Sequence, residues 1–407
     1  MQGNEPPCAK VCRPCATSRA PEPQQYALLT EVLDVLKLDD SLRTSIIPDD
    51  LMRATSQAWR TLQRDNVPVK LHVREPAAAV RQKLEMFVRD GFRVTEVNLD
   101  WKENDPRIEN GDEGMQMLAA VLIQCSLVKL DVSFMKLSDK GAIPLAMVTS
   151  WSPVLTHLNL ACNNIGALGA FTLSHGLRHC TSLQVLSINL NDIRTTGFKA
   201  IVDGLVECSF YGQTPALRSL NVSQNNIEKP LRNAGEKCEL YSSIHTLTSH
   251  CMHLEVLDLT ESMIRALQPV LACLTRLRNM KSLSLCNCDL EFDDSSTCRD
   301  FMSALGYHRT LTTLDLSCNN FYREAFERLA QGLPQCTTLT NLNLAATHLG
   351  WKSNTSAMAT AVAQSPHLKE LDLSLNYISN DDENALKDAW LHDEHDLNLE
   401  FQDDSWS

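Results

Sequence analysis

One short apolar pattern returns along most of this chain of 407 residues. The pattern is L-x-x-L-x-L-x-x-N-x-I, and its cleanest copies begin at Leu155, Leu183, Leu217 and Leu368. Looser copies keep the leucine frame and begin at Leu127, Leu254, Met280, Leu311 and Leu339, after a first one that uses Val94, Val97 and Leu99. At the asparagine position the looser copies carry Met135, Ser262, Cys288, Asn319 and Thr347. About ten such units fold as a stack, because one unit buries its apolar side chains only against its neighbours.

The spacing of the copies predicts what each unit contains. Leucines in the x-L-x-L-x segment alternate, as the inward side chains of a β-strand do. Copies begin 26 to 37 residues apart, most often 28 or 29, which leaves room for a full helix after each strand. Residues 197–205 show apolar side chains at helical spacing. We therefore expect a parallel sheet covered by helices, with the asparagine amide bonded to backbone groups at each strand end.

This pattern resembles the leucine-rich repeats of ribonuclease-inhibitor-like proteins. The resemblance implies an α/β fold, a leucine-rich-repeat solenoid (horseshoe) with a parallel sheet on the concave side and helices on the convex side. It also implies a protein that binds another protein rather than an enzyme. No Walker loop, Rossmann glycine motif, nucleophile elbow or H-E-x-x-H motif occurs, so we expect no catalytic, cofactor-binding or metal-binding residues and no cofactor.

The pattern also predicts where the domains begin and end. We expect a disordered leader at 1–25, a small helical block at 26–66, a capping repeat at 67–93, repeats at 94–380 and an acidic cap and tail at 381–407. In the capping repeat, alternation from Val69 to Val73 predicts a strand and Pro76 opens a helix. Alternation of Leu397, Leu399 and Phe401 predicts a last strand. The acidic tail has two interpretations, a solubilising cap or a docking strip for a basic partner.

Charge and cysteine usage limit the partners and the compartment. The net charge is −13 and the pI about 5.4, which disfavours nucleic acid and anionic membranes. The N-terminus has no apolar leader segment and no long apolar run occurs. Cysteines such as Cys125, Cys180, Cys251 and Cys336 precede the first leucine of a repeat, as buried reduced thiols do. We expect a cytoplasmic protein, with the nucleus, or a host cytoplasm for a secreted bacterial effector, as alternatives.

The spacing of Cys8, Cys12 and Cys15 is that of an iron–sulfur motif. These cysteines precede every predicted element and have no fourth ligand nearby. We interpret them as cysteines of the leader.

Strand alternation predicts which side chains face the concave surface. The set is polar, short and mildly acidic, and we predict a protein-binding surface at Glu96, Asp100, Trp101, Asp131, Phe134, His157, Asp258, Asp315 and Asp372. Its apolar anchor is expected near Trp101 and Phe134. The alternative is that an aspartate or asparagine between two leucines is simply the default of this repeat type.

Residues 26–66 carry two amphipathic segments outside the repeat pattern. The second segment resembles an F-box at Asp50, Leu51, Arg53, Ala54, Trp59, Arg60 and Leu62. The Leu-Pro opening of the F-box is missing, and the connection from Lys37 to Asp49 is longer than usual. The resemblance implies contact with a Skp-type adaptor of a cullin–RING ubiquitin ligase through Leu29, Val32, Leu33, Leu51, Ala54 and Trp59. A plain helical cap on the first repeat is the alternative.

Two function classes follow. The first is a substrate-recognition subunit of an SCF-type ligase, and the second is a stand-alone repeat scaffold or inhibitor, monomeric on its own. A minor alternative rests on Trp101–Arg107, which resembles the arginine-bearing loop of Ran-type GTPase-activating proteins and would give Arg107 a role in phosphoryl transfer.

Overall fold

The computed structural model describes residues 68–72, 75–99, 111–207, 213–227, 234–292, 296–349, 355–390 and 396–399. The chain divides into two compact units, Met1–Pro68 with Arg89–Arg93 and Val69–Val88 with Val94–Ser407. Nearly all described residues belong to the second unit, which contains the repeats. The leader, the F-box-like block, Asp100, Trp101 and Arg107 lie outside the described residues.

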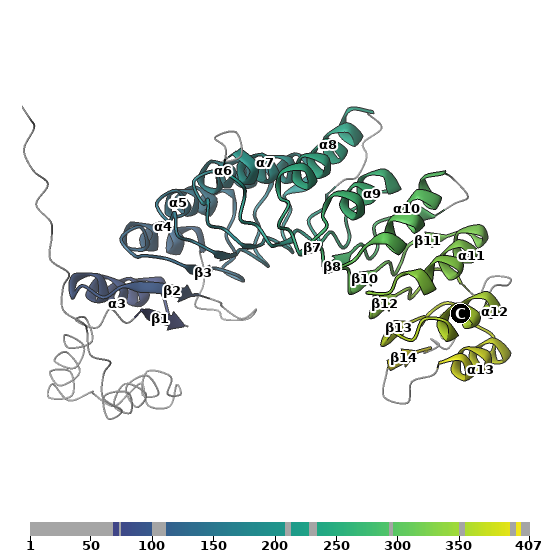
Figure 1. Ribbon diagram of the computed structural model, residues 1–407. Coiled ribbons are helices and arrows are strands. Elements are labelled where there is room, and N and C mark those ends of the chain that lie inside the picture. Colours follow the sequence, from purple (N-terminus) through teal and green to yellow (C-terminus); the bar gives the residue numbers. More distant parts are fainter. Residues whose placement is uncertain are drawn as a thin grey trace, which may run out of the picture. The chain divides into compact units, whose positions relative to one another are not determined.

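The second unit is built on one parallel sheet (Figure 1). Its 12 strands within the described residues pair strictly in chain order. They are β1 (Val69–His72), β2 (Val94–Asn98), β3 (Lys129–Asp131), β4 (His157–Asn159), β5 (Val185–Ser187), β6 (Ser219–Asn221), β7 (Val256–Asp258), β8 (Ser282–Ser284), β10 (Thr313–Asp315), β12 (Asn341–Asn343), β13 (Glu370–Asp372) and β14 (Asp396–Asn398).

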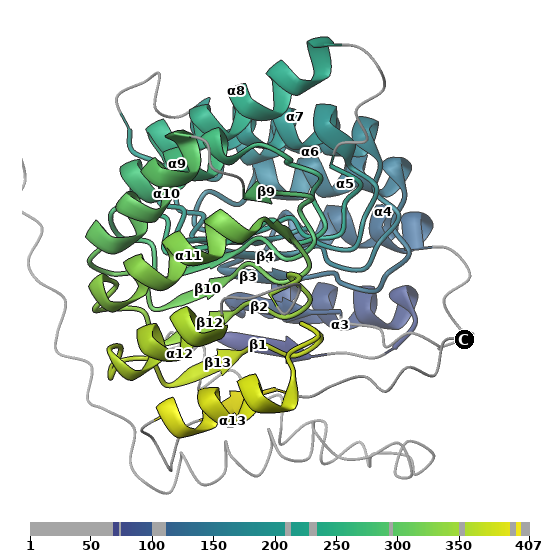
Figure 2. The ribbon, with the colours of Figure 1, turned by 90° about the vertical axis from the view of Figure 1, so that its right-hand side faces the viewer.

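Helices cover one side of this sheet, as Figure 2 shows. They are α3 (Ala77–Arg89), α4 (Gly111–Leu122), α5 (Asp139–Ser150), α6 (Ala167–Leu177), α7 (Arg194–Val206), α8 (Ala234–His250), α9 (Leu267–Arg276), α10 (Ser296–Tyr307), α11 (Arg323–Gly332), α12 (Thr355–Ala363) and α13 (Asn380–Ala389), with a 3₁₀ turn, η3 (Leu333–Gln335). The alternation of one strand with one helix confirms the predicted α/β repeat solenoid.

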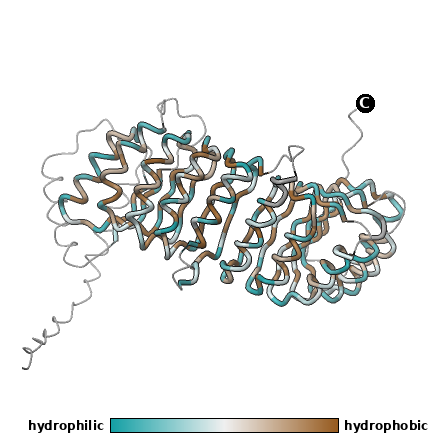
Figure 3. Tube along the Cα trace, turned by 90° about the horizontal axis from the view of Figure 1, so that it is seen from above, coloured by the Kyte–Doolittle hydropathy of each residue, from teal (hydrophilic) through white to brown (hydrophobic). Residues whose placement is uncertain are grey.

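The leucine frame forms the core between the sheet and the helices. Leu155, Leu158 and Leu160 are at most 1% exposed, and their equivalents in the next repeats are buried to the same degree. Strand register explains this order, because Leu158 pairs with Leu130 on one side and Leu186 on the other. Hydrophobic segments therefore recur from repeat to repeat (Figure 3). Stacking these rows stabilises the unit, since buried apolar area is the main favourable contribution.

The asparagine of each repeat bonds to backbone groups at the strand end, as predicted. Nδ2 of Asn163 donates to the carbonyls of Val132 and Leu160, at 3.0 and 2.9 Å. Its Oδ1 accepts the N–H of Leu137 at 3.0 Å, in the preceding repeat. Side chains with the same arrangement are Asn191, Asn225, Asn319 and Asn376. Each asparagine thereby ties two successive repeats together.

Other residues at this position replace the amide incompletely. Oγ1 of Thr347 donates to the Leu344 carbonyl at 2.6 Å, and Sγ of Cys288 donates to the Leu259 carbonyl at 3.2 Å. Burial raises the pKa of the Cys288 thiol far above its usual value, so the thiol keeps its proton. Oγ of Ser262 is buried without a hydrogen-bond partner.

A second, two-stranded parallel sheet was not predicted from the sequence. It pairs β9 (Glu291–Phe292) with β11 (Asn320–Phe321). The Phe292 and Phe321 rings stack with centroids 4.0 Å apart, and Phe301 meets Phe292 edge-on at 5.4 Å. Phe326 packs on Phe321 at 4.8 Å. This aromatic cluster fills the space between the strand layer and helices α10 and α11.

Both ends of the repeat unit carry capping elements. β1 pairs with β2, and α3 follows β1 with Val80, Leu84 and Phe87 buried. At the other end α13 precedes β14, and the acids Asp381, Asp382 and Glu383 occupy the first turn of α13, where they are favourable to the helix dipole. Among the described residues, no helix has the length and apolar character needed to cross a bilayer.

Candidate protein-binding face

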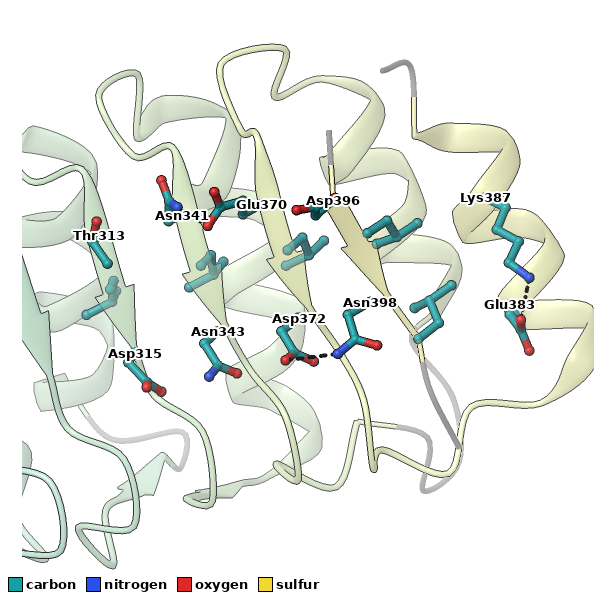
Figure 4. A pocket seen from close by; sticks show the side chains of 15 residues that line it. Thr313, Asp315, Asn341, Asn343, Glu370, Asp372, Glu383, Lys387, Asp396 and Asn398 are labelled. Carbon is teal, nitrogen blue, oxygen red and sulfur yellow. Dashed lines mark hydrogen bonds and ion pairs between the residues drawn. The ribbon is translucent and has the colours of Figure 1, made fainter. Parts of the chain in front are cut away.

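Two rows of side chains point away from the helices along the sheet. We call them the inner face, and they occupy the first and last positions of each three-residue strand. In β10 to β14, Thr313, Asn341, Glu370 and Asp396 form one row, and Asp315, Asn343, Asp372 and Asn398 form the other (Figure 4). Parallel pairing without a shift keeps each row aligned, so the chemistry of the face follows directly from the sequence.

The structure places six of the predicted concave residues on this inner face. They are all half-buried, and they are Glu96, Asp131, His157, Asp258, Asp315 and Asp372. Phe134 lies just beyond β3, half-buried, with a positive φ of 57° in the turn. The remaining two, Asp100 and Trp101, lie outside the described residues, as do all six predicted adaptor-binding residues.

The aspartates and asparagines of the inner face have a structural role at the end of each strand. Oδ1 of Asp315 accepts the N–H of Ser317 at 2.9 Å, and Oδ1 of Asn159 accepts that of Ala161 at 3.1 Å. The same bond, to the residue two positions on, is made by Asp131, Asn221, Asp258, Asn343 and Asp372. Such a side chain satisfies a backbone donor where the ladder ends.

This bond explains why the position is aspartate or asparagine, but not which of the two. Asn159, Asn221 and Asn343 cap the strand end with an uncharged amide. Their distances, 3.0 to 3.1 Å, match those of the aspartates. A negative charge at Asp258, Asp315 or Asp372 is therefore not required by the fold.

The charge of the inner face changes along the sheet. Strands β1 to β4 carry both signs, and Lys70 pairs with Glu96 at 2.9 Å. At His157, burial and the nearby Lys129 lower the pKa of the ring, against a raising effect of Glu96. This end of the inner face presents no excess of one sign.

Strands β10 to β14 border an open groove whose charged residues are nearly all acids. Its negative side chains are Asp315, Glu370, Asp372, Glu383 and Asp396. Lys387 also borders the groove, but its ammonium pairs with Glu383 at 2.5 Å. We call this region the acidic groove. Two of these acids accept hydrogen bonds from side-chain amides of neighbouring strands. Oδ2 of Asp372 accepts from Asn398 at 3.2 Å, and the Asn341 amide donates to Glu370.

Possible metal ligands and the thiols that precede the repeats both occur among the described residues. Among them, no group of three or more histidines, cysteines, aspartates and glutamates is placed to hold a metal ion. The cysteines that precede the repeats are buried, and burial raises the pKa of Cys125 to about 11 and that of Cys180 to about 12. Such thiols stay protonated and unreactive near neutral pH.

A sequence profile described as "Leucine Rich repeat" matches residues 124–146, 152–174, 179–202, 307–321 and 364–382. All five segments contain a strand of the solenoid, and four of them also contain the start of the following helix; the segment 307–321 ends just before α11. The repeats are leucine-rich repeats. Each matched segment contains one three-residue strand of the large sheet, whose first and last residues lie on the inner face.

Two known proteins resemble much of this leucine-rich-repeat chain. Ribonuclease inhibitor from Sus scrofa is 27% identical over 298 residues, 66% of this chain and 62% of that protein. The NACHT, LRR and PYD domains-containing protein 5 of Homo sapiens is 29% identical over 246 residues, 54% of this chain and 20% of that protein. The chain thus spans less than two thirds of either relative. Among solved structures, TLR13 in its complex with ssRNA13 gives a TM-score of 0.41 at 18% identity, over 74% of this chain and 38% of that one.

Proposed function

We propose that this leucine-rich-repeat chain is a non-catalytic binding protein, monomeric on its own, which holds a partner protein on its inner face. The observation that carries the proposal is the acidic groove. Its aspartates keep a charge that the fold does not need, because asparagine makes the same strand-end bond elsewhere. The relative from Sus scrofa is named as an inhibitor of ribonuclease, and its repeats supply the analogy of a repeat surface that acts on another protein.

The chemistry of the groove selects a basic segment of the partner. Four acids lie at the first or last positions of neighbouring strands, namely Asp315, Glu370, Asp372 and Asp396. The nearby Lys387 is already paired with Glu383. Arginine side chains bind carboxylates in two-point hydrogen bonds and suit such a surface. The expected affinity is strongly dependent on salt, because these groups are half-exposed.

The test removes charge and keeps the strand-end bonds. The variant D315N, E370Q and D372N replaces acids by amides that the fold already uses at equivalent positions. Binding of an arginine-rich peptide is measured by calorimetry at two salt concentrations. We expect the variant to bind at least about tenfold more weakly than the wild type, since several charge-assisted contacts are lost together.

A matched control removes three acids from the helices instead. D203N, D300N and D388N change exposed residues of α7, α10 and α13, and the net charge rises by the same amount. This control should bind the peptide as the wild type does. Equal loss in both variants would show a non-specific charge effect, and no binding by the wild type would reject the acidic groove as the partner site.

A finer proposal concerns residues 26–66. The resemblance to an F-box at Asp50, Leu51, Arg53, Ala54, Trp59, Arg60 and Leu62 supports a role as substrate receptor of an SCF-type ubiquitin ligase, in which the repeats hold the substrate. Capture with a purified Skp-type adaptor tests it. Wild type should bind, and the double change L33D and W59A should abolish binding while the circular dichroism of the repeats stays unchanged.

The competing proposal is a stand-alone scaffold or inhibitor without a ligase link. The similarity to ribonuclease inhibitor supports this alternative if the adaptor does not bind. Either function is compatible with the cytoplasm, where the buried thiols Cys125, Cys180, Cys251 and Cys336 would remain reduced. Localisation of a tagged chain by microscopy checks the compartment.

A further inference from the structure

An exposed apolar surface lies on the outer side of helices α5 and α6, away from the inner face. Along α5, Ile143, Met147 and Trp151 recur at every fourth residue and are 56%, 53% and 68% exposed. On α6, Leu168 and Phe171 are 66% and 55% exposed. Val154, in the turn after α5, is exposed as well. We call these six side chains the outer platform.

The two helices lie side by side and hold the platform rigidly (Figure 1). α6 approaches α5 so closely that a Cβ added at Gly176 would lie 2.6 Å from the Ala146 carbonyl oxygen. Asp139, at the start of α5, accepts the N–H groups of Gly166 and Gly169 at 2.7 and 2.9 Å. Both helices follow parallel strands, so their exposed side chains form two neighbouring rows.

The composition of this region differs from that of the rest of the chain. The sequence has 50 acidic residues among 407, yet no aspartate or glutamate stands between Asp139 and Asp192. Of the two acids at the border, Asp139 is engaged in the caps of α6, and Asp192 pairs with Arg194 at 3.0 Å. Interface centres are depleted of charge and enriched in tryptophan, phenylalanine and methionine, which is the composition found here.

Neighbouring helices lack this character, so it is not a general property of the repeats. The outer side of α7 carries Thr196, Lys199 and Asp203, and the last two form an ion pair at 2.5 Å. On α4 the exposed side chains include Glu113 and Gln116 beside Met117. The platform is therefore bounded on both sides by polar helices.

The border of the platform includes an exposed lysine and one ion pair. Lys140 and His175 are exposed, and Phe171 meets the His175 ring edge-on at 5.0 Å. Arg178 lies at the end of α6, where Glu207 pairs with it at 3.1 Å. Because Arg178 is paired with Glu207, Lys140 is the side chain that gives this border a positive charge, on a chain whose net charge is −13. A partner with acids around an apolar centre complements it.

We propose that the outer platform binds an amphipathic helix of a partner protein, which packs apolar side chains on the two exposed rows and carries acidic side chains on its flanks. The exposed apolar residues are four apart along α5 and three apart along α6. A partner helix with apolar residues at i, i+3, i+4 and i+7 has a stripe of similar spacing to pack against them. A lipid surface fits less well, because membrane binding of this kind needs a cluster of basic residues. A second copy would oppose Lys140 and Arg178 to their own equivalents. This site is separate from the acidic groove.

Two synthetic peptides test the proposal on the full chain. Both carry leucines at i, i+3, i+4 and i+7; one has glutamates on the flanks and the other lysines. Fluorescence polarisation should show tighter binding of the glutamate peptide. The double variant W151S and F171S should weaken it at least about tenfold, and both residues are exposed, so the circular dichroism spectrum and thermal midpoint should not change.

A charge variant and a matched control sharpen the test. K140E should weaken binding of the glutamate peptide about threefold and strengthen binding of the lysine peptide. Y307S and Y322S remove two other exposed aromatic side chains, 74% and 52% exposed, and should leave binding unchanged. Equal binding by wild type and the W151S and F171S variant, or no binding at all, would overturn the proposal.

Two further measurements identify a different occupant. Sedimentation of vesicles of phosphatidylcholine and phosphatidylserine with wild type, but not with the W151S and F171S variant, would assign the platform to lipid. Self-association in sedimentation equilibrium that the same variant abolishes would assign it to a second copy. Either result would contradict the proposal. The arginine-rich peptide at the acidic groove should bind equally to wild type and to this variant, so the two sites fail independently.

Discussion

The repeats of β4 to β6 and those of β7 to β10 have the same fold but are stabilised differently. In the first group, Asn163, Asn191 and Asn225 occupy the asparagine position in succession, and each bonds to two repeats. In the second group, Ser262 and Cys288 stand there in the repeats of β7 and β8, and an asparagine, Asn319, returns in that of β10. The hydroxyl of Ser262 has no hydrogen-bond partner. The second group adds the aromatic cluster around Phe292 and the two-stranded sheet of β9 and β11.

Helix packing differs between the same two groups. α5, α6 and α7 approach each other through glycines, since a Cβ at Gly204 would lie 2.6 Å from the Ser174 carbonyl oxygen. α9 contains no glycine, and the glycine of α10, Gly306, faces Gln335 of η3, whose Cβ would lie 3.5 Å from an added Cβ. The comparison shows that the same leucine frame can be stabilised by asparagine hydrogen bonds or by packed aromatic rings. Each group of repeats should therefore be sensitive to different substitutions.

The largest effect is expected at Phe292. Replacing it by alanine removes a fully buried ring and its stacking on Phe321, and should lower the free energy of unfolding by about 4 kcal/mol. Hydrogen exchange should show that protection is lost first around β9 to β11. Protection lost equally in β4 to β6 would contradict the local role of the cluster.

The matching substitution in the first group is Asn225→Ala. It leaves the buried carbonyls of Ile188 and Val222 without their donor, and should cost about 3 kcal/mol. Urea denaturation measures the loss. Asn226→Ala, an exposed neighbour, is the control and should cost well under half as much.

Gly204 tests the helix packing of the first group. Alanine there meets the Ser174 carbonyl, and we expect a loss of about 2 kcal/mol. Gly332→Ala is the matched control in α11, where nothing lies within 4 Å of the added Cβ, and it should be neutral or slightly stabilising. Equal effects at the two glycines would show that α6 and α7 can move apart without a loss in the free energy of unfolding.

A buried histidine makes the second group sensitive to acid. Nδ1 of His308 accepts the N–H of Leu311 at 3.1 Å, its Nε2 lies 3.2 Å from the Leu277 carbonyl oxygen, and burial lowers its pKa. Below about pH 6.5 the unfolded chain takes up a proton that the folded ring refuses, so stability falls as the pH falls. His308→Asn should be less stable than wild type at pH 7.5, by a margin that shrinks at pH 5. The exposed His253→Asn is the control and should lower the free energy of unfolding by less than His308→Asn does at pH 7.5.

The smallest effect is expected at Ser262. Its buried hydroxyl has no partner, so Ser262→Ala should change the free energy of unfolding by less than about 1 kcal/mol, in the stabilising direction. A loss comparable to that of Asn225→Ala would show that the hydroxyl carries an interaction after all. Thermal denaturation of the two variants side by side measures the contrast.

The sequence predicts the solenoid because leucine spacing determines strand, helix and register together. It also predicts which side chains lie on the inner face, from Glu96 to Asp372, since parallel strands in register align equivalent positions. It does not predict the pair β9 and β11, because Phe292 and Phe321 lie in connections whose length varies from repeat to repeat.

The outer platform was missed for a related reason. The sequence prediction of an apolar anchor near Trp101 and Phe134 concerned the sheet alone and stays a prediction. It did not include the exposed apolar side chains of α5 and α6, among which Trp151 is 68% exposed. Which face of a helix is covered depends on the angle at which it leaves the strand, and the leucine frame does not encode that angle. One signal was present in the sequence: the absence of acids between Asp139 and Asp192.

The strand-end bond has a consequence for how such a protein can change partners. Aspartate and asparagine codons differ by a single base, and either side chain accepts the same backbone N–H, as Asp372 and Asn343 do in adjacent strands. A lineage can therefore rewrite the electrostatic pattern of the sheet one repeat at a time, through intermediates that all fold. Recognition can then diverge while the scaffold stays constant.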